Sequence, residues 1–289
     1  MTSTDFATPR ETHPLDQTLA QLRAMGEWYA AYAGACAATS AWLPATEIAC
    51  AHSPQWQKYL GESIAQSGLT DKRLHGYGLF NGHTWLMTTA AVACYLLDRR
   101  VPDLNPAHVR FGEVPHDGHN LTVLRFAQPH FFCLPTDPHA QHPDATVLQD
   151  ESELRAMFHR QIETHYPPVM QALYEMSGYG PKAMWAQTSD NVINVLVGHV
   201  ERSGQHSQLD ALLAQFAKVG GSPLNMRNGV LCVMHKDKTK LMIDRASCCN
   251  WYRWPEAKGE MCMSCPRYSR AQRLALMLAE LQKGDSAMH

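Results

Sequence analysis

The sequence is poor in charge and has no long apolar run. Of its 289 residues, 18% are charged, and the formal net charge is only −2. So small a net charge predicts no electrostatic attraction to nucleic acid or to anionic membranes. In the longest uncharged stretch, 74–97, only the part from 85 to 97 is densely apolar. That part is shorter than the roughly twenty apolar residues of a transmembrane helix. It predicts a buried helix and no transmembrane segment.

Two kinds of motif are also missing. Residues 1–12 are polar and lack the apolar core of a secretory signal. We therefore expect a cytoplasmic protein. A location at the inner face of the cell membrane is the alternative. The sequence has neither a Gly-x-Gly-x-x-Gly fingerprint after a strand nor a phosphate-binding loop. If the chain is a redox protein, its electrons must come from a separate donor.

Periodicity predicts an α+β fold that is mostly helical, with a central antiparallel strand region and a small C-terminal module. We expect Pro167-Pro168 to bend or end the helix in which they lie. The predicted helices cover 14–39, the region around 56–64, 81–100, the segment from Asp150, the segment after Pro181, 209–216 and 274–281. The predicted strands are 108–114, 121–126, 130–134 and a hairpin of 230–235 with 240–244. The only domain boundary that we predict separates residues 1–225 from 226–289.

The nine cysteines are unevenly distributed along the chain. Five are scattered in apolar contexts, where a free cysteine is usually a small buried hydrophobe. These five are Cys36, Cys50, Cys94, Cys133 and Cys232. The other four lie within eighteen residues near the C-terminus, namely Cys248, Cys249, Cys262 and Cys265. In a reducing compartment, such a cluster predicts a metal site.

The spacing within this cluster favours iron and sulfur over zinc. Cys262 and Cys265 form a Cys-x-x-Cys turn, which can direct two thiolates to one metal atom in iron–sulfur and zinc sites alike. Cys248 and Cys249 are adjacent, and adjacent side chains of a strand point to opposite faces. They can reach one cofactor only if the backbone turns there. A zinc site normally takes two Cys-x-x-Cys pairs, whereas a two-iron cluster is larger. Zinc and unliganded redox thiols remain alternatives.

The C-terminal segment resembles the FhuF-type siderophore-iron reductases. Their signature is Cys-Cys, ten residues, Cys, two residues, Cys, and it holds a 2Fe–2S cluster. Here the spacer is twelve residues long, 250–261, and it begins with a similar aromatic and basic run, 251–255. The segment 181–185, with a Trp after a basic residue at a helix start, is also similar to the family. The resemblance implies a helical α+β domain over 1–225, like part of the siderophore synthetases, and a 2Fe–2S module over 226–289.

The resemblance also implies a function, one-electron reduction of siderophore-bound Fe(III) to Fe(II) in the cytoplasm. The implied partners are a ferric siderophore and a ferredoxin-like or flavin/nicotinamide-dependent electron donor. Aromatic and cationic residues near the cysteines are candidates for siderophore binding. They are Trp251, Arg253, Trp254 and Arg267. Alternatively, the tryptophans cover the cluster and the arginines are only solvated. A non-enzymatic zinc module and an iron–sulfur sensor are the alternative functions.

Histidines offer a second possible set of metal ligands. The sequence has sixteen, and His139 and His142 have His-x-x-His spacing in a Pro-rich loop. A lone pair of this kind in a polar loop is typical of ordinary surface, and we predict no metal there.

Overall fold

The computed structural model describes residues 12–34, 42–116 and 119–286. The chain divides into two compact units, and each is assembled from two segments. The first unit comprises 1–56 and 85–172, and the second comprises 57–84 and 173–289. The boundary that we predicted near residue 226 therefore lies inside the second unit. Within the described residues, no helix is both long and apolar enough to cross a membrane.

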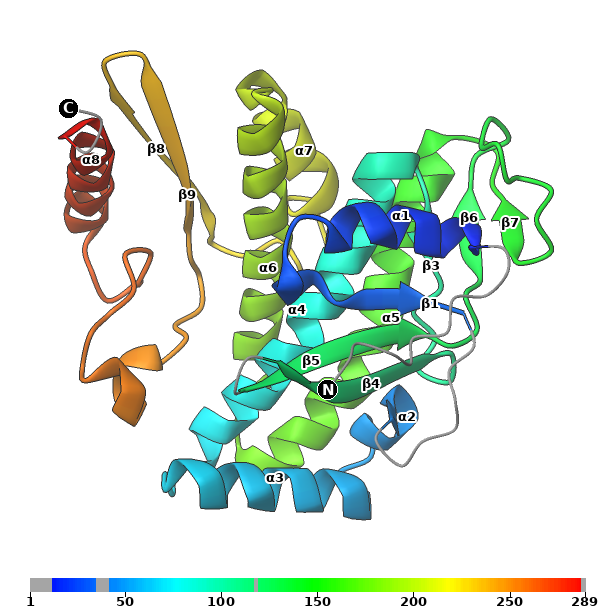
Figure 1. Ribbon diagram of the computed structural model, residues 1–289, viewed down its shortest axis with the longest axis horizontal. Helices are drawn as coiled ribbons and strands as arrows, with labels where there is room; N and C mark the ends of the chain where they lie inside the picture. Colours follow the sequence, from blue (N-terminus) through cyan, green and yellow to red (C-terminus); the bar gives the residue numbers. More distant parts are fainter. Residues whose placement is uncertain (1–11, 35–41, 117–118, 287–289) are drawn as a thin grey trace. The chain divides into compact units, whose positions relative to one another are not determined.

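The first unit is built on a mixed sheet with strand order β1-β5-β4-β2, of which β1, β5 and β4 are labelled in Figure 1. β4 (Val109–His116) and β5 (His119–Phe126) form the antiparallel pair that the sequence predicts. β1 (Ala31–Ala33) runs parallel to β5, and β2 (Leu43–Pro44) runs antiparallel to β4. A second sheet has the order β3-β6-β7. Its strands are β3 (Val101–Pro102), β6 (Phe131–Cys133) and β7 (Ala145–Val147).

The first predicted helix is much shorter in the structure. α1 (Pro14–Arg23) buries Leu15, Leu19 and Leu22, as its periodicity predicts. The helix then ends, and Gly26 adopts a φ of 151° that a side chain would strain. The prediction that the helix continues to 39 is wrong, because β1 gains main-chain hydrogen bonds by pairing with β5. Cys36 lies outside the described residues.

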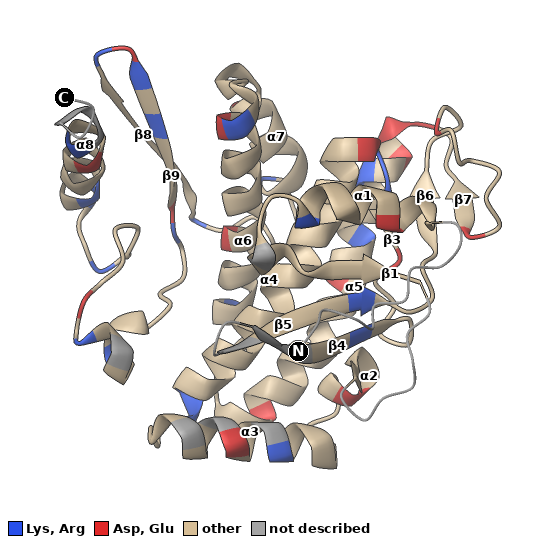
Figure 2. Cartoon of the chain, in the orientation of Figure 1, with Lys and Arg blue, Asp and Glu red and all other residues tan. Residues whose placement is uncertain are grey.

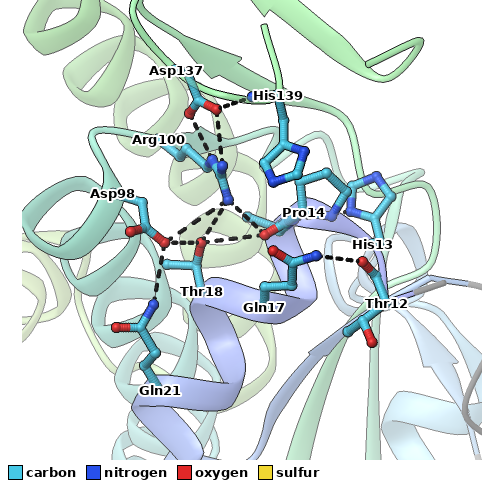
Figure 3. Close-up of polar contacts among 11 residues, drawn as sticks. Thr12, His13, Pro14, Gln17, Thr18, Gln21, Asp98, Arg100, Asp137 and His139 are labelled. Atoms are coloured by element: carbon cyan, nitrogen blue, oxygen red, sulfur yellow. Dashed lines mark hydrogen bonds and ion pairs between the residues drawn. The ribbon is translucent and has the colours of Figure 1, made fainter. Parts of the chain in front are cut away.

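A buried arginine ties α1 to the rest of the first unit (Figure 3). Arg100 donates hydrogen bonds from Nε and Nη2 to the two carboxylate oxygens of Asp137, at 2.7 and 2.9 Å. Its Nη1 donates to the Pro14 carbonyl at 2.7 Å and to Thr18 Oγ1 at 3.1 Å. The fork of the guanidinium thereby joins the start of α1 to the loop after β6.

Two long helices depart from their predicted bounds. α4 (Lys72–Asp98) begins nine residues before Asn81, which we expected at its start. α5 (Glu151–Ser177) runs through Pro167-Pro168, so of the two expected effects, a bend or an end, the prolines do not end this helix. Gly76 of α4 lies so close to Ser177 that a Cβ there would collide with the serine side chain. This glycine therefore permits tight helix packing.

The second unit places a hairpin beside α6 (Pro181–Ser203). The hairpin strands are β8 (Gly229–His235) and β9 (Lys238–Asp244), close to their predicted bounds. The unit also contains α3 (Pro54–Ser67), α7 (Leu209–Phe216) and α8 (Arg270–Ser286). α8 packs against β8 and β9. Figure 2 shows acidic and basic residues spread over many elements, in agreement with the small net charge. The protein is thus an α+β protein, as predicted.

Candidate metal site formed by four cysteines

The four clustered cysteines lie in the connection between β9 and α8, which is built from turns. Cys248 and Cys249 follow the end of β9 at Asp244. Asn250 then takes a left-handed conformation, with a φ of 51°, and a short 3-10 helix covers Trp251–Arg253. A second, Pro255–Ala257, precedes a left-handed Lys258. These reversals bring the chain back, so that Cys262 and Cys265 can meet the first pair.

The thiols contact one another across the two segments. Cys249 Sγ and Cys262 Sγ lie 3.9 Å apart. Burial and the neighbouring Cys265 thiol raise the pKa of Cys248, so these two residues also interact across the segments. Within the second pair, the Cys265 amide donates to the Cys262 carbonyl at 2.9 Å, which closes the Cys-x-x-Cys turn. One direct sulfur–sulfur contact, between Cys249 and Cys262, therefore joins the two segments, and Cys248 and Cys265 interact across them as well.

Donors point at two of the sulfurs. The Asn250 amide donates to Cys248 Sγ at 3.4 Å, and Ser264 Oγ donates to Cys262 Sγ at 3.9 Å. Arg245 Nε donates to Ser264 Oγ at 2.9 Å, so that a cation orients the serine hydroxyl. Donors of this kind stabilise thiolate charge and help to set the potential of iron–sulfur centres.

The contact between Cys249 and Cys262 changes the acidity of both thiols. The hydrogen bond from Cys262 lowers the pKa of Cys249 to about 6, and Arg245 also favours the thiolate. The same hydrogen bond, together with burial, raises the pKa of Cys262. The two sulfurs thus share one proton near neutral pH. A thiolate is the form that binds metal, and a metal ion would displace the shared proton.

The donor set fits a metal centre with thiolate ligands. Two thiolates on one tetrahedral iron or zinc atom, at about 2.3 Å from the metal, lie about 3.8 Å from each other. The separation of 3.9 Å between Cys249 and Cys262 matches this geometry. A 2Fe–2S cluster takes two thiolates on each iron, which suits a pairing of Cys249 with Cys262 and of Cys248 with Cys265. Four thiolates around a single zinc ion would use the same residues.

The other cysteines divide into two groups. Cys94 and Cys133 are buried as predicted, and burial raises the pKa of the Cys133 thiol to about 11. Cys50 and Cys232 are exposed, so the prediction that they are buried is wrong. Cys232 is exposed on β8, whereas its neighbour Leu231 is buried, because successive side chains of a strand point to opposite faces. Apolar neighbours in the sequence do not show which face a residue occupies.

The four predicted siderophore-binding residues have different environments. Trp251 is 45% exposed. Trp254 is partly buried, packs edge-on against His75 at 5.7 Å and lies over Gly78 of α4. Trp254 therefore packs against α4, whereas Trp251 presents an exposed face.

Both arginines are exposed, but each is held by a neighbour. Arg253 forms an ion pair with Asp71 at 2.7 Å. Arg267 donates to the Tyr252 hydroxyl at 2.8 Å and lies 4.7 Å from the centre of that ring. Their guanidinium groups are therefore positioned in advance, at the surface of the cysteine loop.

Protein-family models and curated proteins offer no match to this chain. The similarity to siderophore-iron reductases thus depends on the cysteine motif and its flanking residues.

Sequence reasoning missed several residues of the site. Asp190, Arg245 and Ser264 hold the cysteine loop, and Asp71 pairs with Arg253. Asp71 and Asp190 are far from the cysteines in sequence, and no spacing rule connects them. Ser264 lies between the Cys-x-x-Cys cysteines, so its position offered a signal, since hydroxyl groups there can reach sulfur.

A histidine cluster in the first unit was also missed. His13, His142 and Asp144 place potential ligand atoms within 4.8 Å of one another. Nδ1 of each ring, however, accepts a backbone N–H, from Leu15 for His13 and from Asp144 for His142. His13 Nε2 hydrogen-bonds to Asp144 at 3.2 Å. These three ring nitrogens already form hydrogen bonds within the protein. We therefore interpret the cluster as a cap at the start of α1.

Proposed function

We propose that this protein is an iron–sulfur reductase that transfers single electrons to ferric iron held by a siderophore. The main support is the meeting of cysteines from two separate segments, with Cys249 Sγ and Cys262 Sγ 3.9 Å apart, beside an exposed tryptophan. Cys248, Cys249 and Cys262 are only partly buried, so a cofactor held there would lie near the surface. The resemblance of the cysteine motif to siderophore-iron reductases supports the same reading.

Reduction is an effective way to release iron from a siderophore. Hard oxygen ligands bind Fe(III) tightly and the less charged Fe(II) much more weakly. A single electron therefore converts a locked complex into a labile one. When bound, a 2Fe–2S cluster supplies electrons one at a time. The overall balance is one electron from the reduced protein and one Fe(III) converted to Fe(II).

The residues of the loop have separate roles in this proposal. The four cysteines hold the cluster, and the Asn250 amide and the Ser264 hydroxyl stabilise charge on the sulfurs. Trp251 offers an exposed aromatic face, and Arg253 and Arg267 offer positioned cations. Such a surface suits an anionic or amide-rich chelate.

The proposal requires a second protein and a reducing compartment. We propose a ferredoxin-like or flavin/nicotinamide-dependent reductase as the electron donor, because the sequence offers no recognisable nucleotide motif. We also propose a cytoplasmic location, where thiols stay reduced and a cluster can be assembled.

The cofactor is tested first. Anaerobically purified protein should be reddish-brown and contain equal amounts of iron and acid-labile sulfide. Reduction with dithionite should produce an electron paramagnetic resonance signal. A colourless protein with stoichiometric zinc would support the alternative zinc module and remove the reductase.

The reaction is tested with the reduced protein. We expect a ferric hydroxamate siderophore and a ferrous trap to oxidise the cluster and yield trapped Fe(II). The same siderophore loaded with Ga(III), which has the same charge but accepts no electron, is the control. If the protein carries the cluster but keeps its electron with every ferric siderophore class, it has another role, such as that of a sensor.

A further inference from the structure

The adjacent cysteines pose a geometric problem. Side chains of neighbouring residues in an extended strand point to opposite faces, so Cys248 and Cys249 can serve one site only if the backbone before them is turned and held. β9 ends at Asp244, and a few residues separate it from the pair. The residues that hold this short stretch lie elsewhere in the second unit.

A buried carboxylate on α6 holds it. Asp190 is 0% exposed, within a run of buried polar residues, 187–191, in the middle of the helix. An isolated carboxylate in such a place would be strongly unfavourable, and it must be compensated by hydrogen bonds. Four donors surround it, three of which belong to Ala246 and Ser247, just before the cysteines.

The contacts leave neither oxygen free. Oδ1 accepts the Ala246 amide at 3.0 Å and Asn228 Nδ2 at 2.8 Å. Oδ2 accepts the Ser247 amide at 2.9 Å and the Ser247 hydroxyl at 2.6 Å. Two successive amides therefore point at one side chain, which an extended strand does not allow. The backbone turns at this point.

Asn228, one of the donors to the Asp190 carboxylate, is itself fixed by further hydrogen bonds. Asn228 Nδ2 also hydrogen-bonds to Ser189 Oγ, at 2.9 Å, and Lys218 Nζ donates to Asn228 Oδ1 at 2.6 Å. On the other side of the pair, the Asn250 amide donates to Cys248 Sγ. Hydrogen bonds thus fix the backbone on both sides of Cys248 and Cys249, at Ala246-Ser247 before the pair and at Asn250 after it.

We propose that Asp190 is the positioning residue of the metal site, and that its carboxylate holds the turn which lets two adjacent thiolates face one metal centre. The inference rests on the metal site of the proposed function but not on the siderophore reaction. Asp190 does not touch the thiols, and it acts through the backbone amides of Ala246 and Ser247 and through the Ser247 hydroxyl.

An asparagine at this position tests the idea with little change in volume. Whichever way the amide of Asp190→Asn is oriented, its NH₂ group faces a backbone N–H that the carboxylate now accepts. Either Ala246 or Ser247 loses its acceptor, and the turn loosens. A second variant, Ser247→Ala, removes only the hydroxyl contact and is the milder change.

The chain offers a matched control on the same helix. Glu201 of α6 accepts the Leu241 amide of β9 at 2.8 Å, at a distance from the cysteines along the hairpin. Glu201→Gln weakens a carboxylate contact from α6 to the same hairpin. If loss of any carboxylate contact between α6 and the hairpin loosened the second unit in general, Glu201→Gln should show the same effect. It should not change the positions of the cysteines.

The experiment is a titration of metal-free, reduced full-length protein with Cd(II), followed by the sulfur-to-cadmium charge-transfer absorption. Wild type should bind with four thiolates. Asp190→Asn should bind about tenfold to a hundredfold more weakly, as is typical when a partner behind metal ligands is lost. Ser247→Ala should be weakened less, and Glu201→Gln should match wild type. In protein that carries a cluster, Asp190→Asn should also change the shape of the resonance signal.

The outcomes separate this inference from the proposed function. Folded Asp190→Asn with wild-type Cd(II) affinity would overturn the positioning role. If Asp190→Asn does not fold, Ser247→Ala decides, and wild-type affinity in that variant overturns the role too. Cadmium binding that depends on Asp190, in a protein that never reduces a siderophore, would uphold the positioning role and reject only the reductase.

Discussion

The Sγ atoms of Cys249 and Cys262 lie 3.9 Å apart, although thirteen positions separate the two residues in sequence. This contact joins the adjacent pair to the Cys-x-x-Cys pair. If the site holds two irons, this contact assigns Cys249 and Cys262 to one iron, and Cys248 and Cys265 to the other.

Mild oxidation of metal-free protein tests this pairing. We expect disulfides between Cys249 and Cys262 and between Cys248 and Cys265, identified by peptide mass spectrometry without reduction. The Cys249 thiolate should react first with the added oxidant, because the hydrogen bond from Cys262 lowers the pKa of Cys249 to about 6. The thiol of Cys262 then closes the disulfide. Buried Cys94 should stay reduced. A dominant disulfide between Cys262 and Cys265 would contradict the pairing.

The hydroxyl of Ser264 should raise the reduction potential of the proposed 2Fe–2S cluster. Ser264→Ala removes a donor to Cys262 Sγ and the partner of Arg245. Because such a donor favours the more negative, reduced state, its loss should lower the potential by about 20–40 mV, which corresponds to roughly 0.5–1 kcal/mol for one electron. A redox titration followed by electron paramagnetic resonance measures the shift. Ser264→Thr keeps the hydroxyl and should stay within a few millivolts of wild type, about the error of the method. Equal potentials in Ser264→Ala and wild type would show that the hydroxyl does not act on the centre.

The two tryptophans near the cysteines should differ in role. Trp251→Ala removes an exposed aromatic face and should raise the half-saturating siderophore concentration about five- to tenfold, equivalent to roughly 1 kcal/mol, without changing the visible spectrum. Trp254→Ala removes packing against His75 and should instead lower thermal stability. Stopped-flow oxidation and a melting curve separate the two effects. If Trp251→Ala leaves siderophore saturation unchanged, Trp251 does not contact the substrate.

Arg100 should be among the most sensitive positions of the first unit. Arg100→Met leaves the buried carboxylate of Asp137 without its bidentate partner (Figure 3). We expect a loss of about 3–5 kcal/mol in the free energy of unfolding, measured with urea. Asp137→Asn in the same chain should recover part of this loss, because it removes the unpaired charge. Additive losses in the double variant would mean that the two side chains are not coupled.

His165 should make stability depend on pH. Its ring is buried, and its Nδ1 lies 2.6 Å from the Leu104 carbonyl. Burial lowers its pKa from 6.5 to about 4. The unfolded chain therefore binds a proton near pH 6.5 that the folded chain rejects until about pH 4. The resulting stability, about 3 kcal/mol, is present above pH 6.5 and is lost as the pH falls from 6.5 to 4.

A matched substitution isolates this pH dependence. Asparagine can donate from a position close to that of Nδ1 but does not titrate. His165→Asn should therefore flatten the unfolding free energy between pH 6.5 and 4, measured by urea denaturation at several pH values. An unchanged slope would assign the acid sensitivity to other groups.

Local sequence patterns determined most of the secondary structure. The hairpin, the helix after Pro181 and the strands of β4 and β5 follow from periodicity and turn residues, because these elements depend on near neighbours. The clustering of the four cysteines was also apparent from their spacing, and the structure brings Cys249 and Cys262 into contact. Where the patterns were wrong, a longer-range interaction decided the outcome, as when residues after Gly26 joined β5 instead of extending α1.

Only the tertiary structure decided how the cysteines are paired and held. Asp190 meets Ser247 across 57 positions, and Arg253 meets Asp71 across 182. No periodicity links such residues, because their contacts arise from the packing of α4 and α6 against the C-terminal segment. Burial of Asp190 forces it to find donors, and the amides before Cys248 supply them. The sequence thus determined which residues are candidates for binding a metal, and packing decided which of them face one another.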